Sequence, residues 1–206
     1  MAATKADHPV PARAMHLVHL LSIITLVATG FFLHKPNFSL FGLSMHTARL
    51  IHNYAGFVII LNLVTRFYWS IFGAPGDIGN FLPEKENRGK FFPMLAYYTF
   101  TRRTRPVTAK YNTLQKSTYA FWFLLLLFQA ITGFAMLWNM DPGWASLVAA
   151  MGGLANVHMI HYLTMWVFIV TTMVHIYLVL FEDFRSFKLM FLGIETEESP
   201  QPGEAV

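Results

Sequence analysis

The residues of this sequence with the clearest capacity for chemistry are its histidines. Nine occur among 206 residues, and the chain contains no cysteine. Two of them, His161 and His175, are the first and last residues of the segment HYLTMWVFIVTTMVH, which is otherwise almost wholly apolar. Imidazole binds transition metals and haem iron. The lack of cysteine excludes disulfides, thiolate zinc sites, protein-held iron–sulfur clusters and a covalently attached haem.

Four long apolar segments must position these histidines. The chain is 55% hydrophobic and only 13% charged, whereas about 25% of the residues of a soluble domain are charged. Each segment is long enough to cross a hydrocarbon core of ~30 Å, which needs about 20 helical residues. The segments are His16–Phe32, Tyr54–Phe72, Thr118–Trp138 and His158–Phe181.

We therefore expect an all-α polytopic membrane protein with a bundle of four transmembrane helices. The helices should span about 14–34, 46–73, 113–139 and 157–182, with a long loop at 74–112. The bundle forms one domain, 1–190, and the acidic tail at 191–206 is expected to be disordered. No internal repeat is evident.

The basic residues predict the orientation of the bundle. Eight lysines and arginines lie between positions 85 and 116, and none lies between the third and fourth helices. The positive-inside rule places the basic loop, and hence both termini, in the cytoplasm. The segments FFPMLAYYTFTRR and GWASLVAAMGGLAN are expected to lie along the inner and outer surfaces. The net charge of +4 thus reflects topology and does not indicate a nucleic-acid partner.

This topology assigns a depth to each histidine. His52 and His161 begin helices that enter from outside, so both lie near the outer face. His16 begins a helix that enters from the cytoplasm, and His175 lies fourteen residues beyond His161. That spacing corresponds to ~21 Å along the helix and to nearly four turns, so both imidazoles of this helix share one face. Two facing pairs are therefore predicted, an outer pair and an inner pair.

Two imidazoles on opposed helices are the axial ligands that a b-type haem needs. We therefore predict two haem b groups, one between His52 and His161 and one between His16 and His175. Each histidine has the alternative of a hydrogen bond between helices, although ionisable residues within membranes usually mark function. A proton relay is disfavoured because the central parts of the four segments contain no Asp or Glu. Alternative ligands one turn away are His19 and His158.

Other residues suit a haem setting. Glycines within the helices would permit close approach of a helix or a flat ligand, with ordinary packing of small residues as the alternative. They are Gly30, Gly56 and Gly133. Basic side chains could contact the haem propionates, with anchoring at the membrane interface as the alternative. These are Arg13, Arg49, Arg66 and His158.

Six segments carry a family resemblance that covers all four helices in order. They are RAMH at 13–16, RLIHNYAGF at 49–57, RFYWSIFG at 66–73, YNTLQ at 111–115, ITGFAML at 131–137 and HYLTMWVFIVTTMVHIYLVLFED at 161–183. The sequence resembles the b-type cytochrome subunit of membrane-bound nickel–iron hydrogenases. It is similar, more distantly, to the gamma subunit of formate dehydrogenase within the bacterial cytochrome b561 superfamily. RFYW, HYLTMW and the closing FED favour the hydrogenase branch.

The resemblance implies a four-helix bundle with two haems, whose ligand positions fall on His16, His52, His161 and His175. Two departures from the family are Leu17, where tryptophan is frequent, and Tyr162, where a second histidine is frequent. The resemblance also implies a quinone pocket beside the inner haem, with Asn112 in it. We add Gln115 because a quinone needs hydrogen-bond partners, although Asn112 has the alternative role of capping the third helix.

The function implied by the resemblance is that of an electron-transfer subunit, distinct from the subunit that activates hydrogen. It would lie in the inner membrane of a prokaryote and anchor a periplasm-facing hydrogenase. It would carry electrons from the iron–sulfur small subunit, which binds the large subunit, to menaquinone or ubiquinone. Alternatives are the same role for formate dehydrogenase or thiosulfate reductase, and a free-standing cytochrome b561. A more remote alternative is a transport or scaffold protein without a cofactor.

Overall fold

The computed structural model describes residues 9–36, 42–73, 89–99, 101–104, 113–182 and 184–194. Its seven main elements within these residues are α-helices. They are α1 (Val10–His34), α2 (Met45–Phe72), α3 (Phe91–Tyr98), α4 (Thr113–Leu137), α5 (Pro142–Ala150), α6 (Leu154–Glu182) and α7 (Phe184–Leu192). Four of them, α1, α2, α4 and α6, are long and apolar enough to cross a membrane. The prediction of an all-helical chain with four spanning helices is confirmed.

Local chemistry explains where the helices begin and turn. Proline stands in the first turn of α1 and of α5, where no intrahelical N–H is required. Ser44 caps α2 by accepting a hydrogen bond from the backbone N–H of Thr47 at 3.1 Å. Between α5 and α6, Gly152 and Gly153 have positive φ angles of 86° and 98°, which glycine adopts without steric cost. These glycines let the chain reverse from α5 into α6.

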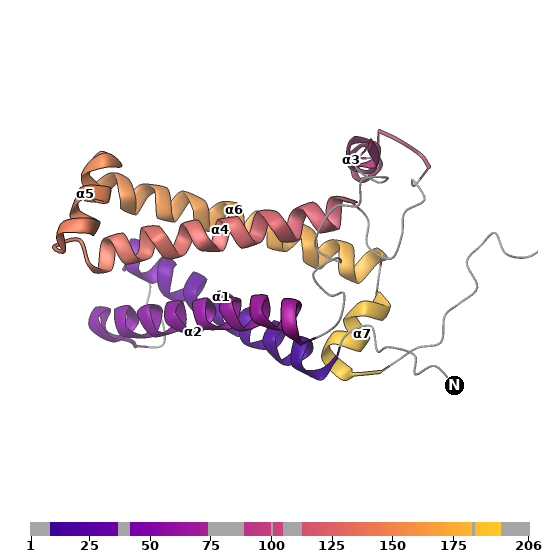
Figure 1. The fold of residues 1–206 in the computed structure, drawn as a ribbon, viewed down its shortest axis with the longest axis horizontal. Coiled ribbons are helices and arrows are strands. Elements are labelled where there is room, and N and C mark those ends of the chain that lie inside the picture. The colour runs from indigo at the N-terminus through magenta and orange to yellow at the C-terminus, as the bar shows by residue number, and fades with distance from the viewer. Residues whose placement is uncertain are drawn as a thin grey trace, which may run out of the picture.

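The four spanning helices form two antiparallel hairpins. Helix α1 packs along α2, and α4 packs along α6, while α2 and α4 connect the two hairpins (Figure 1). Helix α5 lies at one end of the bundle, and α3 and α7 lie at the opposite end. The two segments predicted to lie along the membrane surfaces therefore contain short helices, α3 and α5, at opposite ends of the bundle.

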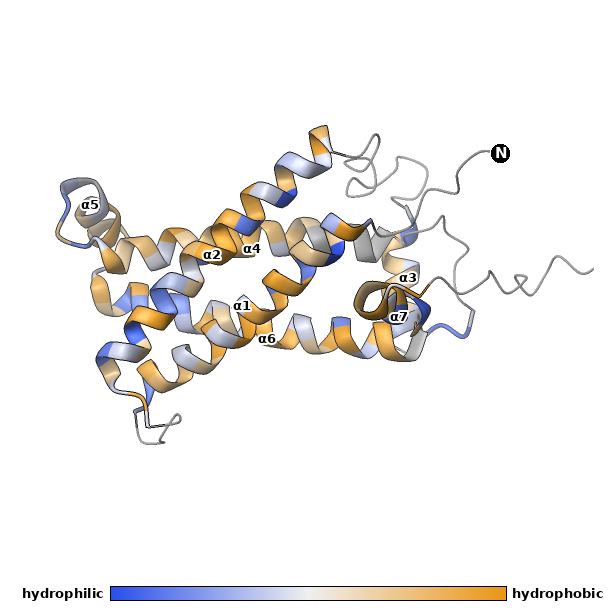
Figure 2. Ribbon diagram, turned by 90° about the horizontal axis from the view of Figure 1, so that it is seen from below, coloured by the Kyte–Doolittle hydropathy of each residue, from blue (hydrophilic) through white to orange (hydrophobic). Residues whose placement is uncertain are grey.

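The outward faces of the long helices are apolar. Figure 2 shows hydrophobic residues along most of their length. Large apolar side chains such as Leu61 and Leu124 are 68% and 62% exposed. Exposure of this kind suits contact with lipid, which is as apolar as leucine itself. Helix association then depends on close packing and on hydrogen bonds between helices.

Two such hydrogen bonds fix the helix pairs. Asn62 of α2 donates from Nδ2 to the backbone carbonyl of Met15 in α1 at 3.0 Å. Trp122 of α4 donates from Nε1 to Thr171 Oγ1 in α6 at 2.9 Å. Each bond holds one hairpin in register at the level of the predicted inner histidines, because Met15 precedes His16 and Thr171 lies one turn before His175.

Candidate functional site

The two predicted outer histidines lie opposite one another across the bundle. His52 belongs to α2 and His161 to α6, so each hairpin contributes one imidazole. Their ring centroids are 6.4 Å apart, and their planes are inclined by 63°. Both side chains are partly buried. The structure therefore brings together two residues that are more than a hundred positions apart in the sequence.

Each imidazole is held by a threonine of the neighbouring helix in its own hairpin. Thr29 Oγ1 lies 2.8 Å from His52 Nδ1, and Thr132 Oγ1 lies 2.8 Å from His161 Nδ1. Each hydroxyl also contacts a backbone carbonyl one turn earlier, that of Thr25 at 2.7 Å and that of Phe128 at 3.0 Å. A carbonyl only accepts hydrogen bonds, so the single hydroxyl proton is donated to it.

The direction of the histidine hydrogen bonds follows. Because each threonine hydroxyl has donated its proton to its own helix, it accepts from the imidazole, and Nδ1 carries the hydrogen. In a neutral imidazole the other nitrogen, Nε2, then has a free lone pair. His52 and His161 are thereby fixed in the tautomer that offers Nε2 to a metal ion. A metal-binding histidine is usually oriented by such a hydrogen bond from the ring nitrogen that does not bind the metal.

A glycine follows each threonine and leaves space beside the ring. A Cβ atom on Gly30 would lie 3.6 Å from His52 Cε1 and 3.3 Å from Met165 Sδ. A Cβ atom on Gly133 would lie 3.6 Å from His161 Cε1. Any larger side chain would occupy the space next to the imidazole. A Cβ atom on Gly56, one turn beyond His52 in α2, would meet nothing within 4 Å, so there is open space beside this glycine as well.

The site is thus built twice from the same tripeptide. Thr-Gly-Phe occurs at 29–31 in α1 and at 132–134 in α4, and each copy faces a histidine of the next spanning helix. Neither threonine was predicted from the sequence, and the repeat was not recognised there. The signal that could have revealed them is this repeated tripeptide, placed near the C-terminal end of the first and third spanning helices.

The geometry of the outer pair fits a haem iron. A metal–histidine bond is about 2 Å long and the ring centre lies about 1 Å behind the nitrogen, so two imidazoles on one metal have centres about 6 Å apart. The observed separation of 6.4 Å agrees. Within the described part of the chain, no group of three or more His, Asp or Glu side chains could hold a metal ion. Two opposed nitrogens suffice for haem, whose porphyrin supplies the remaining ligands.

The predicted inner pair lies toward the other end of the bundle. His16 of α1 and His175 of α6 are close enough for their charges to interact. The ring of His175 packs against the indole of Trp122, with centroids 5.1 Å apart and planes at 75°. The ring of His16 meets Phe191 of α7 edge-on at 5.9 Å. Each inner imidazole therefore packs against one aromatic ring.

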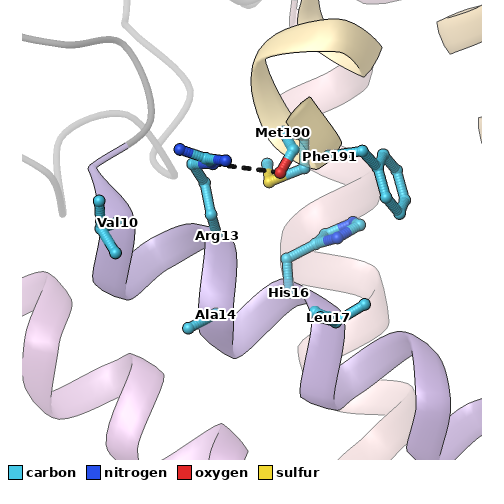
Figure 3. Close-up of a pocket in the computed structure, with 7 residues that line it drawn as sticks. All are labelled: Val10, Arg13, Ala14, His16, Leu17, Met190 and Phe191. Carbon is cyan, nitrogen blue, oxygen red and sulfur yellow. Dashed lines mark hydrogen bonds between the residues drawn. The ribbon is translucent and has the colours of Figure 1, made fainter. Parts of the chain in front are cut away.

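A pocket of about 200 Å³ lies beside His16, between the start of α1 and the end of α7. Figure 3 shows Arg13 and His16 on the side of α1 that faces α7. Arg13 donates from Nε to the carbonyl of Met190 at 3.2 Å, which places its positive charge at the C-terminal end of α7, where a helix dipole favours it. The pocket is accordingly lined by one imidazole, one guanidinium and apolar groups.

The remaining predicted residues are distributed as follows. His19 is partly buried one turn beyond His16, and His158 is exposed although it lies within electrostatic reach of His161. Arg49 is exposed and Arg66 is partly buried. Asn112 lies outside the described residues, and so does the side chain of Gln115, which belongs to α4. The structure thus places His161, rather than His158, opposite His52.

Fold and site together define a helical membrane protein with paired histidines suited to haem. Residues 7–193 match the family described as prokaryotic cytochrome b561. The chain belongs to this family, and membership implies haem b as its cofactor.

Individual relatives are more specific. The chain is 33% identical over 199 residues to a probable Ni/Fe-hydrogenase B-type cytochrome subunit of Rhizobium leguminosarum bv. viciae, covering 85% of this chain and 80% of the relative. It is 29% identical over 192 residues to a protein of the same description from Azotobacter vinelandii, with the same coverage of both chains. It is 27% identical over 195 residues to the probable Ni/Fe-hydrogenase 1 B-type cytochrome subunit of Escherichia coli K12, covering 85% of this chain and 82% of the relative.

Proposed function

We propose that this chain is the membrane-anchoring di-haem cytochrome b subunit of a periplasm-facing [NiFe] hydrogenase. It carries electrons from the iron–sulfur relay of the hydrogenase small subunit across the inner membrane to the quinone pool. The observation that carries the proposal is the facing pair of His52 and His161, 6.4 Å apart, each anchored through Nδ1. The names of the relatives support a hydrogenase as the partner.

The residues of the outer site have distinct tasks. His52 and His161 would hold the haem iron through Nε2, while Thr29 and Thr132 would hold the two rings through Nδ1. Haem b supplies reversible one-electron exchange when bound. The lack of side chains at Gly30 and Gly133 leaves room beside the rings for a flat macrocycle, and the surrounding apolar helices exclude water.

The inner site is proposed to be equivalent, with His16 and His175 as axial ligands. Its Arg13 guanidinium, beside His16, is suited to a propionate, and Arg49, Arg66 and His158 remain proposed propionate contacts elsewhere. The quinone, menaquinone or ubiquinone, is proposed to bind near the inner site with Asn112 and Gln115 as hydrogen-bond partners. Protons for quinone reduction would then come from the cytoplasm.

The direction of transfer has an energetic requirement. Moving one electron inward against a membrane potential that is negative inside costs ~2.3 kcal/mol per 100 mV. The donor must therefore be a strong reductant, and hydrogen satisfies this condition. The chain contains no cysteine, so the iron–sulfur relay has to belong to a partner. We infer that this partner docks at the outer end of the bundle, at the end occupied by α5.

Spectra of histidine variants test the haem assignment. The purified complex should show a b-type α-band in its reduced-minus-oxidised spectrum and contain two haems per chain by pyridine haemochrome. His52→Ala and His161→Ala should each lose one and the same haem, and His16→Ala and His175→Ala should each lose the other. His158→Ala serves as the control, because this exposed histidine should leave both haems bound.

The outcomes discriminate between the alternatives. A wild-type spectrum without a b-type α-band would favour a cofactor-free membrane protein, and joint loss of one haem in His16 and His52 variants would refute the proposed pairing. Partner identity requires mild-detergent purification followed by mass spectrometry and nickel analysis. Copurification with a nickel protein supports the hydrogenase, whereas a molybdenum enzyme or no partner would favour the other oxidoreductases or a free-standing cytochrome b561.

A further inference from the structure

We propose that Thr29 and Thr132 are matched positioning residues that lower the reduction potential of the outer haem by accepting the Nδ1–H groups of its two axial imidazoles. This inference rests on the proposed function, since it assumes that His52 and His161 bind haem iron. It adds an electronic role for two residues that bind the imidazoles and not the iron. It also gives the repeated Thr-Gly-Phe segment a chemical purpose.

The contacts at the two threonines are nearly identical. Both Oγ1 atoms lie 2.8 Å from a histidine Nδ1, and each donates its own proton to a carbonyl of its helix. The two side chains are 3% and 0% exposed, so water does not compete for the imidazole N–H. Hydrogen bonds in such low-dielectric surroundings are stronger than in water. Each threonine oxygen therefore helps to fix the orientation and the tautomer of its ring, and at His52 the backbone carbonyl of Leu26 also interacts with the imidazole.

A hydrogen bond donated from Nδ1 acts on the metal through the ring. It increases the basicity of the ligand nitrogen on the opposite side of the imidazole. A more basic ligand stabilises oxidised iron more than reduced iron, because the oxidised iron carries more positive charge. Two such bonds, one on each axial ligand, act in the same direction and lower the potential.

The inner pair provides an internal comparison. The described contact of the His175 ring is with the indole of Trp122, and this ring makes no hydrogen bond to any residue that the structure describes. The nearby Thr171 hydroxyl accepts from Trp122 instead. The effect of the two threonines should therefore be confined to one of the two haems.

Two other threonines are matched controls. Thr25 lies one turn from Thr29 and donates from Oγ1 to the carbonyl of Leu21 at 2.9 Å. Thr164 of α6 is buried and donates to the carbonyl of Ile160 at 2.8 Å. Within the part of the chain that the structure describes, neither hydroxyl makes a hydrogen bond to a histidine nitrogen. Replacing either by valine removes a hydroxyl from a spanning helix while leaving the imidazoles untouched.

Redox titration of the complete complex tests the proposal. In Thr29→Val and Thr132→Val, both haems should remain bound, and the same one of the two α-band components should move to higher potential. A tenfold loss in the preference for oxidised iron corresponds to ~59 mV for a one-electron couple. Thr29→Ser and Thr132→Ser restore the hydroxyl and should restore the wild-type potential. Thr25→Val and Thr164→Val should leave both potentials unchanged.

Several results would overturn the proposal. They are unchanged potentials in both valine variants, shifts of different haems in the two variants, and shifts of equal size in the controls. If a valine variant assembles without the outer haem, the serine variant at the same position tests the role of the hydroxyl. A serine variant that binds the outer haem at the wild-type potential supports this role, and a serine variant without that haem refutes it. Failure of the proposed function is separate, since it would appear as the absence of b-type haem or as its retention in His52→Ala.

Discussion

Replacing Gly133 by leucine should remove the outer haem while leaving the inner one in place. A Cβ at this position already lies 3.6 Å from His161 Cε1, which is ordinary van der Waals contact. Alanine should therefore be tolerated. Leucine adds three further carbons to a side that faces the imidazole, and they must displace the ring or fill the space intended for the cofactor.

The size of the effect follows from two contributions. Overpacking of a filled site costs about 1–3 kcal/mol. Displacement of the ring also breaks the 2.8 Å contact between His161 and Thr132, and a hydrogen bond of this kind contributes about 1 kcal/mol. Since 1.4 kcal/mol is a factor of ten in affinity, haem should bind about 10²-fold more weakly. The helix itself does not oppose the change, because leucine is a better helix former than glycine by ~0.8 kcal/mol.

The matched control is Gly133→Ala. Its Cβ would lie 3.6 Å from His161 Cε1, at ordinary van der Waals distance, so this variant should keep both haems. The assay is haem per chain by pyridine haemochrome in the purified complex, with the spectrum identifying which haem is lost. Two haems retained in Gly133→Leu would refute the reasoning, and so would an equal loss in Gly133→Ala.

Two further predictions concern the opposite end of the bundle. Trp122→Phe and Thr171→Val each remove the hydrogen bond between Trp122 Nε1 and Thr171 Oγ1 at 2.9 Å. Each should therefore lower the stability of the α4–α6 pair by ~0.6–1.7 kcal/mol, as measured by thermal unfolding. The double variant should show no further loss from this bond, because either single substitution already removes it. Arg13→Leu removes the bond to the Met190 carbonyl and the favourable charge at the end of α7, which contributes about 0.3–1 kcal/mol. In this variant, amide hydrogen exchange should become faster in α7 but not in α3. Equal protection of α7 in the wild type and in Arg13→Leu would contradict a stabilising contact between Arg13 and α7.

Much of the architecture followed from hydropathy and charge. The four spanning helices are readable from the sequence because each needs about 20 apolar residues to satisfy its backbone within lipid. The proximity of His52 and His161 could also be predicted, since a fixed rise per residue converts sequence position into depth. The same counting placed His16 and His175 at a common level. The position of a residue along the axis of a spanning helix follows directly from its place in the sequence, because each helical residue advances the chain by about 1.5 Å.

The partners of these histidines could not be obtained in the same way. Whether Thr29 contacts His52 depends on the rotation of α1 about its axis and on the distance between α1 and α2. The apolar pattern predicts neither the rotation nor the distance, because lipid-facing and bundle-facing positions are equally hydrophobic. The docking of Arg13 on α7 joins two segments 177 positions apart. No local propensity predicts such a contact.

The sequence by itself therefore determined the number of spanning helices, the depth of each histidine and the absence of cysteine ligands. Tertiary structure alone decided which imidazole nitrogen is free. That choice depends on where the proton of each threonine hydroxyl is donated, and hence on the packing of two helices to within hydrogen-bond distance. Thr-Gly-Phe is a short string that occurs twice in the chain. Its meaning became apparent only when both copies were found against a histidine, at the same 2.8 Å.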